Sequence, residues 1–297
     1  MKRAGVTLIV FILILLLFPS CGNSRESNPP VSAPPYHTWL SLGEMDYGNP
    51  ETPPPLELPP KDAFPWAGIA SHHVLAHSYL DAWFAQLAKM RQIKTFYIVS
   101  PSHYGISVET YSLTDRAWDA GSGLVESDTA KVHSLAEKLK VELEPGIFRI
   151  EHGVSTFMPY INKYFPNANV VAIALEGEPP VNIPAARALA EALESRFDRK
   201  GKKDNFLLIS SDFSHHHGII ETAKRDALSE AYFRNPANRS WNQVGCDNRP
   251  GIYSLHYLGK NNPRASIMYH TNSWEISGQD GDDITSYFFV YFLDGKR

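Results

Sequence analysis

Three short apolar segments of the chain each end in polar residues of the kinds that bind metal ions. They run into Ser71-His72-His73, Pro101-Ser102-His103 and Ser210-Ser211-Asp212-Phe213-Ser214-His215. Ligands of open α/β sheets collect at the carboxyl ends of the strands, so residues far apart in sequence would converge there on one crevice. The first candidates for a metal or catalytic site are therefore His72, His103, Asp212 and His215.

The local sequence indicates how well each of these histidines is placed to bind a metal. His103 follows a Ser-Pro-Ser turn in which proline removes a backbone donor, so the imidazole would be held rigidly, as suits a ligand. His72 and His73 are neighbours at a strand exit, where successive side chains point different ways. The residues alone do not decide which of the two is the ligand, and His73 is a candidate for a supporting role beside it.

Asp212 and His215 have the spacing of one helical turn. If Asp212 begins a helix, its carboxylate and the imidazole of His215 face the same side and could act as an acid-base pair. The alternative is that Asp212 or Ser214 only caps that helix. Glu151, before a helix-like segment, could likewise cap it or orient an imidazole, and His152 beside it could support a ligand.

The chain has two cysteines, Cys21 and Cys246. Cys246 lies in a turn-forming run, Val244 to Gly251, which suits a ligand loop better than a core, although a buried apolar residue or a reactive thiol is the alternative. Imidazole and thiolate ligands together favour iron, copper or zinc over magnesium or calcium. Arg249 nearby could lower the thiol pKa or bind an anionic group.

Hydrophobic periodicity predicts the elements that position these residues. Strands are expected at 63–70, 95–99, 169–175, 205–209, 264–270 and 285–292, and helices at 74–90, 127–139, 153–164 and 184–197. Strand, helix and strand in close succession form right-handed βαβ units with parallel strands. The fold class is therefore α/β, with three layers: a mostly parallel central sheet and helices on both faces.

The N-terminus carries a pattern typical of export. Met1-Lys2-Arg3 precedes an apolar stretch from Val6 to Phe18 that is short for a membrane span, and Ser20-Cys21 follows. This predicts a signal peptide at 1–20, a lipidated Cys21 that anchors the chain to a bacterial membrane on its periplasmic or extracellular face, a proline-rich tether at 21–61 and a metal-binding domain at 62–297. Cleaved secretion and an uncleaved anchor are the alternatives.

Charge and motifs exclude several functions. The formal net charge is −4 and no basic stripe is visible, so nucleic acid is not an expected partner. The sequence also has no Gly-rich phosphate loop and no Cys-x-x-Cys redox pair.

The order of the motifs resembles that of the MEMO family, also called AmmeMemoRadiSam system protein B. Ser100-Pro101-Ser102-His103 is similar to the family's Gly-Pro-Ser-His, Glu151-His152-Gly153 to its Glu-His-Ser, and Ser210-Ser211-Asp212-Phe213-Ser214-His215 to its Ser-Ser-Asp-Phe-Ser-His. His72 falls on the histidine of the first family motif and Cys246 on the family cysteine. The similarity covers about residues 65 to 292.

This resemblance implies the fold of the class III extradiol dioxygenases (LigB-like). It also implies a mononuclear iron or copper site formed by His72, His103 and Cys246, with Asp212 and His215 beside it. Three functions are compatible with such a site: a redox enzyme that acts on a phenolic or other small substrate with dioxygen, a surface-anchored protein that binds a small molecule or peptide without turnover, and a metal-dependent hydrolase.

Overall fold

A computed structural model of the chain describes residues 33–37, 52–178, 180–197, 204–236, 240–259, 264–278 and 281–293. Within these ranges the main sheet has eight strands. Seven follow one another in the order β10 (Arg264–Asn272), β11 (Ile284–Leu293), β2 (Pro65–Ala70), β8 (Asn205–Ser210), β3 (Thr95–Pro101), β7 (Asn169–Leu175) and β4 (Ser112–Thr114), and β9 (Phe213–His217) pairs with β11.

The centre of this sheet, β2-β8-β3-β7, is parallel, and antiparallel strands flank it. The central strands are buried on both faces, as parallel strands between helical layers must be. Their side chains alternate between two apolar clusters. In β3, for example, Phe96 and Ile98 belong to one cluster, and Tyr97 and Val99 to the other.

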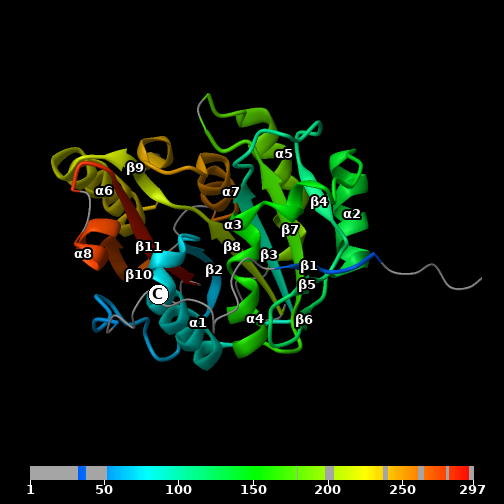
Figure 1. The fold of residues 1–297 in the computed structure, drawn as a ribbon, viewed down its shortest axis with the longest axis horizontal. Helices are drawn as coiled ribbons and strands as arrows, with labels where there is room; N and C mark the ends of the chain where they lie inside the picture. Colours follow the sequence, from blue (N-terminus) through cyan, green and yellow to red (C-terminus); the bar gives the residue numbers. More distant parts are fainter. Residues whose placement is uncertain are drawn as a thin grey trace, which may run out of the picture. The chain divides into compact units, whose positions relative to one another are not determined.

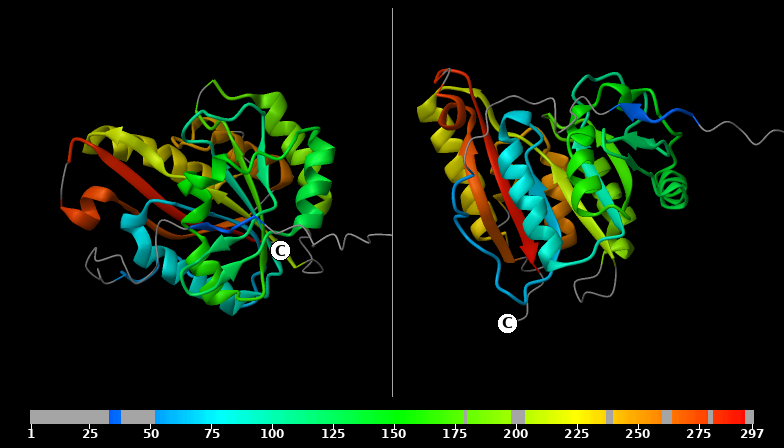
Figure 2. Two further views of the ribbon diagram at one scale, coloured as in Figure 1. Left: turned by 45° about the vertical axis from the view of Figure 1, so that its right-hand side comes forward. Right: turned by 60° about the horizontal axis from the view of Figure 1, so that its bottom comes forward.

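Helices cover both faces of the sheet (Figures 1 and 2). The first apolar cluster takes side chains from α1 (His77–Met90), α3 (His152–Ser155) and α4 (Met158–Tyr164). The second takes them from α2 (Thr129–Leu139), α5 (Ile183–Leu193), α6 (Ile219–Arg234) and α7 (Arg249–Gly259). A short helix, α8 (Ser273–Ser277), precedes β11. The predicted three-layer α/β class is confirmed.

Most predicted elements are present with small shifts of their ends. The helix expected at 74–90 begins as a 3₁₀ turn, Val74–Ala76, before α1, and the helix expected at 153–164 is divided into α3 and α4. The helix expected to start at Asp212 is wrong: β9 follows instead, and α6 begins only at Ile219. No side chain of the described residues caps α6, so the capping alternative does not hold for that helix.

Part of the predicted tether lies on the folded domain. β1 (Tyr36–His37) pairs with β5 (Trp118–Asp119), which pairs with β6 (Leu124–Val125) in a small second sheet. Tyr36 is buried, and its hydroxyl bonds Thr114 Oγ1 at 2.7 Å. The Leu56 amide donates to the carbonyl of Met268 at 2.9 Å. The domain therefore takes in residues before position 62.

The predicted signal peptide and Cys21 lie outside the described residues. Among the helices that the structure does describe, none has the length and apolar character needed to cross a bilayer.

Candidate metal centre

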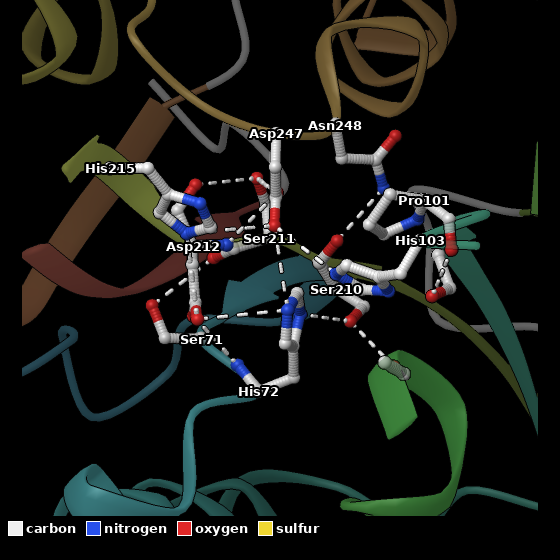
Figure 3. Close-up of polar contacts among 12 residues, drawn as sticks. Ser71, His72, Pro101, His103, Ser210, Ser211, Asp212, His215, Asp247 and Asn248 are labelled. Carbon is white, nitrogen blue, oxygen red and sulfur yellow. Dashed lines mark hydrogen bonds and ion pairs between the residues drawn. The ribbon is translucent and has the colours of Figure 1, made fainter. Parts of the chain in front are cut away.

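The ends of three neighbouring parallel strands bring the candidate residues together. β8 lies between β2 and β3, and the register pairs Ala70 with Ser210. His72 and Asp212 each come two residues after the end of their strand, and so does His103 after β3. Figure 3 shows these side chains converging on one centre, together with His215 and Asp247.

Asn248 fastens the loop that carries Asp247 to the sheet. Its side-chain amide donates to the carbonyls of Val99, at 2.9 Å, and Ser210, at 2.8 Å, and its Oδ1 accepts from the Gly251 amide at 2.9 Å. These three side-chain hydrogen bonds all go to backbone atoms, and the residue is fully buried. The position of Asp247 is therefore fixed relative to β3 and β8.

One oxygen of the Asp247 carboxylate accepts hydrogen bonds that orient the group, and the other oxygen faces the histidines. Oδ1 accepts from Ser211 Oγ at 2.9 Å and from the Asp212 amide at 3.0 Å. Oδ2 faces three imidazole Nε2 atoms, those of His72 at 3.4 Å, His103 at 3.6 Å and His215 at 3.8 Å. Oδ2 and the Nε2 atoms of His103 and His215 are buried and have no hydrogen-bond partner among the described residues.

These spacings fit a metal ion. Nitrogen and oxygen ligands lie about 2.0–2.2 Å from a transition metal such as zinc, which places two tetrahedral ligands about 3.4 Å apart. A third imidazole, that of His152, lies close to this centre. One ring nitrogen each of His72, His103 and His152 lie within 4.8 Å of one another. A site of three histidines that could hold a metal ion is thus present.

Hydrogen bonds fix the His72 ring with its ligating atom toward the centre. Ser210 Oγ donates its hydrogen to the Gly153 carbonyl at 2.5 Å, so at 2.8 Å from His72 Nδ1 it can only accept. His72 Nδ1 must therefore carry a hydrogen. In the neutral ring this leaves Nε2 with a free lone pair, the form that binds metals.

Glu151 orients His103 in the same way. Its Oε1 lies 2.6 Å from His103 Nδ1, and its Oε2 accepts the His103 amide at 3.0 Å. It also caps α3 by accepting from the Gly153 amide at 2.8 Å, so both roles considered for this acid from the sequence occur together. A carboxylate behind a ligating histidine is a common way of fixing the ring and raising its basicity.

Burial and neighbouring charges shift the pKa values of the histidines and acids of the site in different directions. Burial lowers the pKa of His72 well below its usual value, with only partial compensation by Asp212. Burial also acts against the charged form of His103, but the carboxylates of Asp247 and Glu151 beside its ring nitrogens raise its pKa to about 10. Burial raises the pKa of Asp247, whereas for Asp212 the charges of His72 and His215 outweigh burial and lower it. The two acids thus differ in proton affinity.

His215 reaches the centre from β9, an irregular strand. Its Nε2 lies 3.8 Å from Asp212 Oδ2, and about a third of the side chain is exposed. Burial would lower its pKa, but the nearby carboxylates of Asp212 and Asp247 raise it. The flanking residues Ser214 and His216 have φ of 45° and 57°, a left-handed conformation that costs a non-glycine residue about 1–3 kcal/mol.

A buried acid, Asp226 on α6, holds this strained segment. Its Oδ1 accepts from Ser214 Oγ at 2.6 Å, and its Oδ2 from Ser286 Oγ at 2.6 Å and His270 Nε2 at 3.0 Å. Asp226 is only 4% exposed, so these bonds replace water around its carboxylate. The network ties the left-handed Ser214, and with it His215, to β10 and β11.

Asp226→Ala should lower the free energy of unfolding by about 3 kcal/mol, because it leaves two buried serines and a histidine without their charged acceptor. Guanidinium denaturation of the full chain measures this. The matched control is Glu221→Ala on the same helix, an acid in exposed ion pairs with Lys224 and Arg225, which should cost less than about 0.5 kcal/mol. Equal losses in the two variants would contradict the role of the network.

The structure places Cys246 apart from the histidines. Its backbone bridges Phe213 in extended form, so its side chain points away from that of Asp247 and packs against the second apolar cluster. Burial and the nearby charge of Asp247 raise the thiol pKa to about 12. The ligand set predicted from the sequence is therefore not assembled; Asp247 stands where Cys246 was expected.

The remaining predicted residues border the site. His73 Nδ1 lies 2.8 Å from Tyr287 Oη, and the two rings stack. The His152 ring lies against that of His103, with centroids 4.1 Å apart. Arg249 donates to the Val244 carbonyl at 3.2 Å and so braces the loop that holds Cys246 and Asp247.

Comparison with known proteins places the chain in a family. The sequence pattern of the Memo-like protein family matches residues 64–234, more than half of the chain. The chain belongs to the Memo-like family. This member is 28% identical over 180 residues to a MEMO1 family protein of Pyrobaculum aerophilum, a match that spans 60% of this chain and 63% of that protein. A MEMO1 family protein of Sulfolobus acidocaldarius is 24% identical over 94% of this chain and all of that protein.

A solved structure supports the fold of this Memo-like protein. The uncharacterized protein JW3007 from Escherichia coli K12 superimposes with a TM-score of 0.51 at 11% identity, over 75% of this chain and 98% of that one. At this identity the likeness concerns the fold alone. The LigB-like architecture expected from the sequence is consistent with it.

Proposed function

We propose that this Memo-like protein is a mononuclear iron enzyme that uses dioxygen, with His72, His103 and Asp247 as the metal ligands. The supporting observation is that Asp247 Oδ2 lies 3.4 and 3.6 Å from the Nε2 atoms of these two histidines without a hydrogen bond. Two histidines and one carboxylate with open positions are typical of iron(II) oxygenases. Such an ion would supply binding of dioxygen and substrate and the redox chemistry.

The protein's own groups have complementary tasks. Ser210 and Glu151 hold the rings of His72 and His103 so that both Nε2 atoms face the ion. His215, with a raised pKa and a partly exposed ring, holds a proton next to the centre and would donate it to the substrate. Asp212 stabilises the protonated ring at 3.8 Å and also anchors the His72 amide at 3.0 Å.

Oxygen uptake by anaerobically loaded protein tests the reaction. With iron(II) and a panel of catechols we expect substrate-dependent consumption of dioxygen, and His215→Gln should lower kcat by about 100-fold or more while iron content stays the same. The matched control is His133→Gln, which changes an exposed histidine that pairs with Asp115 at 3.1 Å. Tight iron binding without oxygen uptake would favour a protein that binds a ligand without turnover. Ester hydrolysis without oxygen uptake would favour a metal-dependent hydrolase.

We also propose that the domain works at a bacterial membrane surface, held there by lipid on Cys21. The support is the basic start, the apolar stretch from Val6 to Phe18 and the Ser20-Cys21 that ends it. A single acyl chain binds membranes only marginally, so firm retention needs the several chains of a bacterial lipoprotein.

Cys21→Ser should move the protein from the membrane fraction to the soluble fraction or leave it unprocessed. Metal binding should not change, because Cys21 precedes the domain and supplies no ligand. Fractionation of wild type and variant, with mass spectrometry of the mature N-terminus, measures both effects. An unmodified Cys21 with residues 1–20 still attached would refute the anchor.

A further inference from the structure

A third histidine, His152, stands beside the two proposed histidine ligands but takes no part in the proposed iron site. One of its ring nitrogens lies within 4.8 Å of ring nitrogens of His72 and His103. Its ring centroid is 4.1 Å from that of His103 and 5.2 Å from that of His72, and the ring is partly exposed. The metal centre is therefore bordered by one more imidazole than iron(II) needs.

The backbone of His152 is held in place from both sides. Before it, Glu151 caps α3 by accepting the Gly153 amide at 2.8 Å. After it, the Gly153 carbonyl accepts Ser210 Oγ at 2.5 Å, and a side chain at 153 would collide with Ser100 Oγ. Ser100 and Ser210 belong to β3 and β8, so the backbone of His152 is fixed relative to the strands that position the metal centre.

The ring of His152, by contrast, is not fixed by hydrogen bonds. Ser210 Oγ lies 2.8 Å from Nδ1 of His72. Glu151 Oε1 lies 2.6 Å from Nδ1 of His103. Neither ring nitrogen of His152 has a hydrogen-bond partner among the described residues, and its ring lies against those of the other two histidines. Because hydrogen-bonded partners are what fix the orientation of a ligating imidazole, the His152 ring is free to turn.

Only a small movement of the His152 ring would bring it to a shared metal ion. Nitrogen ligands lie about 2.0–2.1 Å from a transition metal, which places two of them roughly 3–4 Å apart. The nitrogens of the three histidines lie within 4.8 Å of one another. A movement on the order of 1 Å is therefore enough for His152 to bind the same ion as His72 and His103.

Metals differ in how much they would gain from this additional imidazole. Affinity for nitrogen ligands rises from iron(II) to copper(II), and copper(II) favours four nitrogen and oxygen ligands in a tetragonal arrangement. Three imidazole nitrogens and one carboxylate oxygen are available here, from His72, His103, His152 and Asp247. Iron(II) is typically held by two histidines and one carboxylate, with its other positions open. Copper(II) therefore gains from the additional ring, and iron(II) does not require it.

We propose that the metal decides the ligand set of this centre: copper(II) takes His152 as an additional ligand, whereas iron(II) binds without it. His152 then sets the preference of the centre for copper(II) and leaves its affinity for iron(II) nearly unchanged. The inference rests on the metal ligands proposed above, His72, His103 and Asp247, but it does not depend on the proposed oxygen chemistry.

Pulsed electron paramagnetic resonance of the copper(II)-loaded full chain tests the proposal, because it counts the imidazoles bound to the ion. We expect three imidazoles in the wild type and two in His152→Gln. Excess glycine removes copper that is weakly bound at exposed histidines. Titration of copper(II) against a competing chelator should show an affinity loss of at least about 100-fold in His152→Gln, because a ligand is lost. Iron(II) affinity should change by less than about 5-fold, which is below the effect of changing a group that orients a ligand.

Asp247→Asn and His133→Gln are the comparison variants. Asp247→Asn should lower the affinity for iron(II) and keep three imidazoles on copper(II). His133→Gln changes an exposed histidine on α2 and should alter the binding of neither metal. Circular dichroism of the metal-free proteins shows whether each variant is folded.

Two results would overturn the proposal. One is a count of two imidazoles in the wild type, or wild-type copper(II) affinity in folded His152→Gln. The other is an equal loss of copper(II) and iron(II) affinity in His152→Gln, which would make His152 a ligand of both metals. Wild-type iron(II) affinity in Asp247→Asn would contradict the proposed iron site, whereas the imidazole count on copper(II) supports or overturns the role of His152 independently.

Discussion

Alanine in place of His72 or His103 should abolish the stoichiometric binding of a transition metal. Each ring presents an Nε2 atom to the same Asp247 oxygen, at 3.4 and 3.6 Å, and each is held by a specific partner, Ser210 or Glu151. Changes to such outer partners alone typically cost about 10- to 100-fold in affinity, so loss of a ligand should cost more. Elemental analysis of protein purified without added metal, followed by titration with iron(II), measures the loss.

His133→Ala is the control, since that imidazole is exposed and lies on α2. Circular dichroism separates lost ligation from lost folding, which matters because His72 is buried. For the same reason His72→Gln, which keeps a polar side chain, should be measured beside His72→Ala. Wild-type metal content in a folded variant at either position would remove that histidine from the site.

The fold could be predicted from the sequence because its strongest signals are local. The central strands are short, continuous apolar runs, and the helices of the two outer layers repeat apolar residues at helical spacing. Where long-range contacts decide the structure, the same signals fail. Asp212 and His215 have helical spacing, yet Phe213–His217 form β9. The reason is that β11 and the loop at Gly245 supply the backbone partners of this segment and that Asp226 accepts the Ser214 hydroxyl.

The candidate site was predictable in part for the same reason. His72, His103, Asp212 and His215 follow strand ends that the sequence reveals, so their convergence follows from the topology of a parallel sheet. Asp247 lies in a loop after α6, and its orientation depends on Asn248, whose three side-chain bonds reach β3, β8 and α7. The sequence does carry one signal here. Side chains alternate in extended backbone, so the neighbours Cys246 and Asp247 cannot both face the metal centre.

Variants at positions 246 and 247 decide which side chain completes the site. Asp247→Asn should lower iron affinity at least about 100-fold, because it replaces a charged oxygen ligand that faces His72 and His103 by a neutral amide. Cys246→Ala should leave iron content within experimental error of the wild type, because the thiol packs against the apolar side chains of the second cluster and not toward the histidines. Elemental analysis and iron(II) titration of both proteins compare the two effects directly.

The opposite result would favour Cys246 as the ligand, as the sequence resemblance implies. Loss of metal in Cys246→Ala with retention in Asp247→Asn would require the loop to turn by one residue, against the bonds of Asp247 to Ser211 and Asp212. Visible absorption of the copper(II)-loaded protein provides an independent test, since thiolate ligation gives an intense charge-transfer band that imidazole and carboxylate ligands lack. Absence of that band in wild type, together with the affinity loss in Asp247→Asn, is the result expected of a site built from two histidines and one carboxylate.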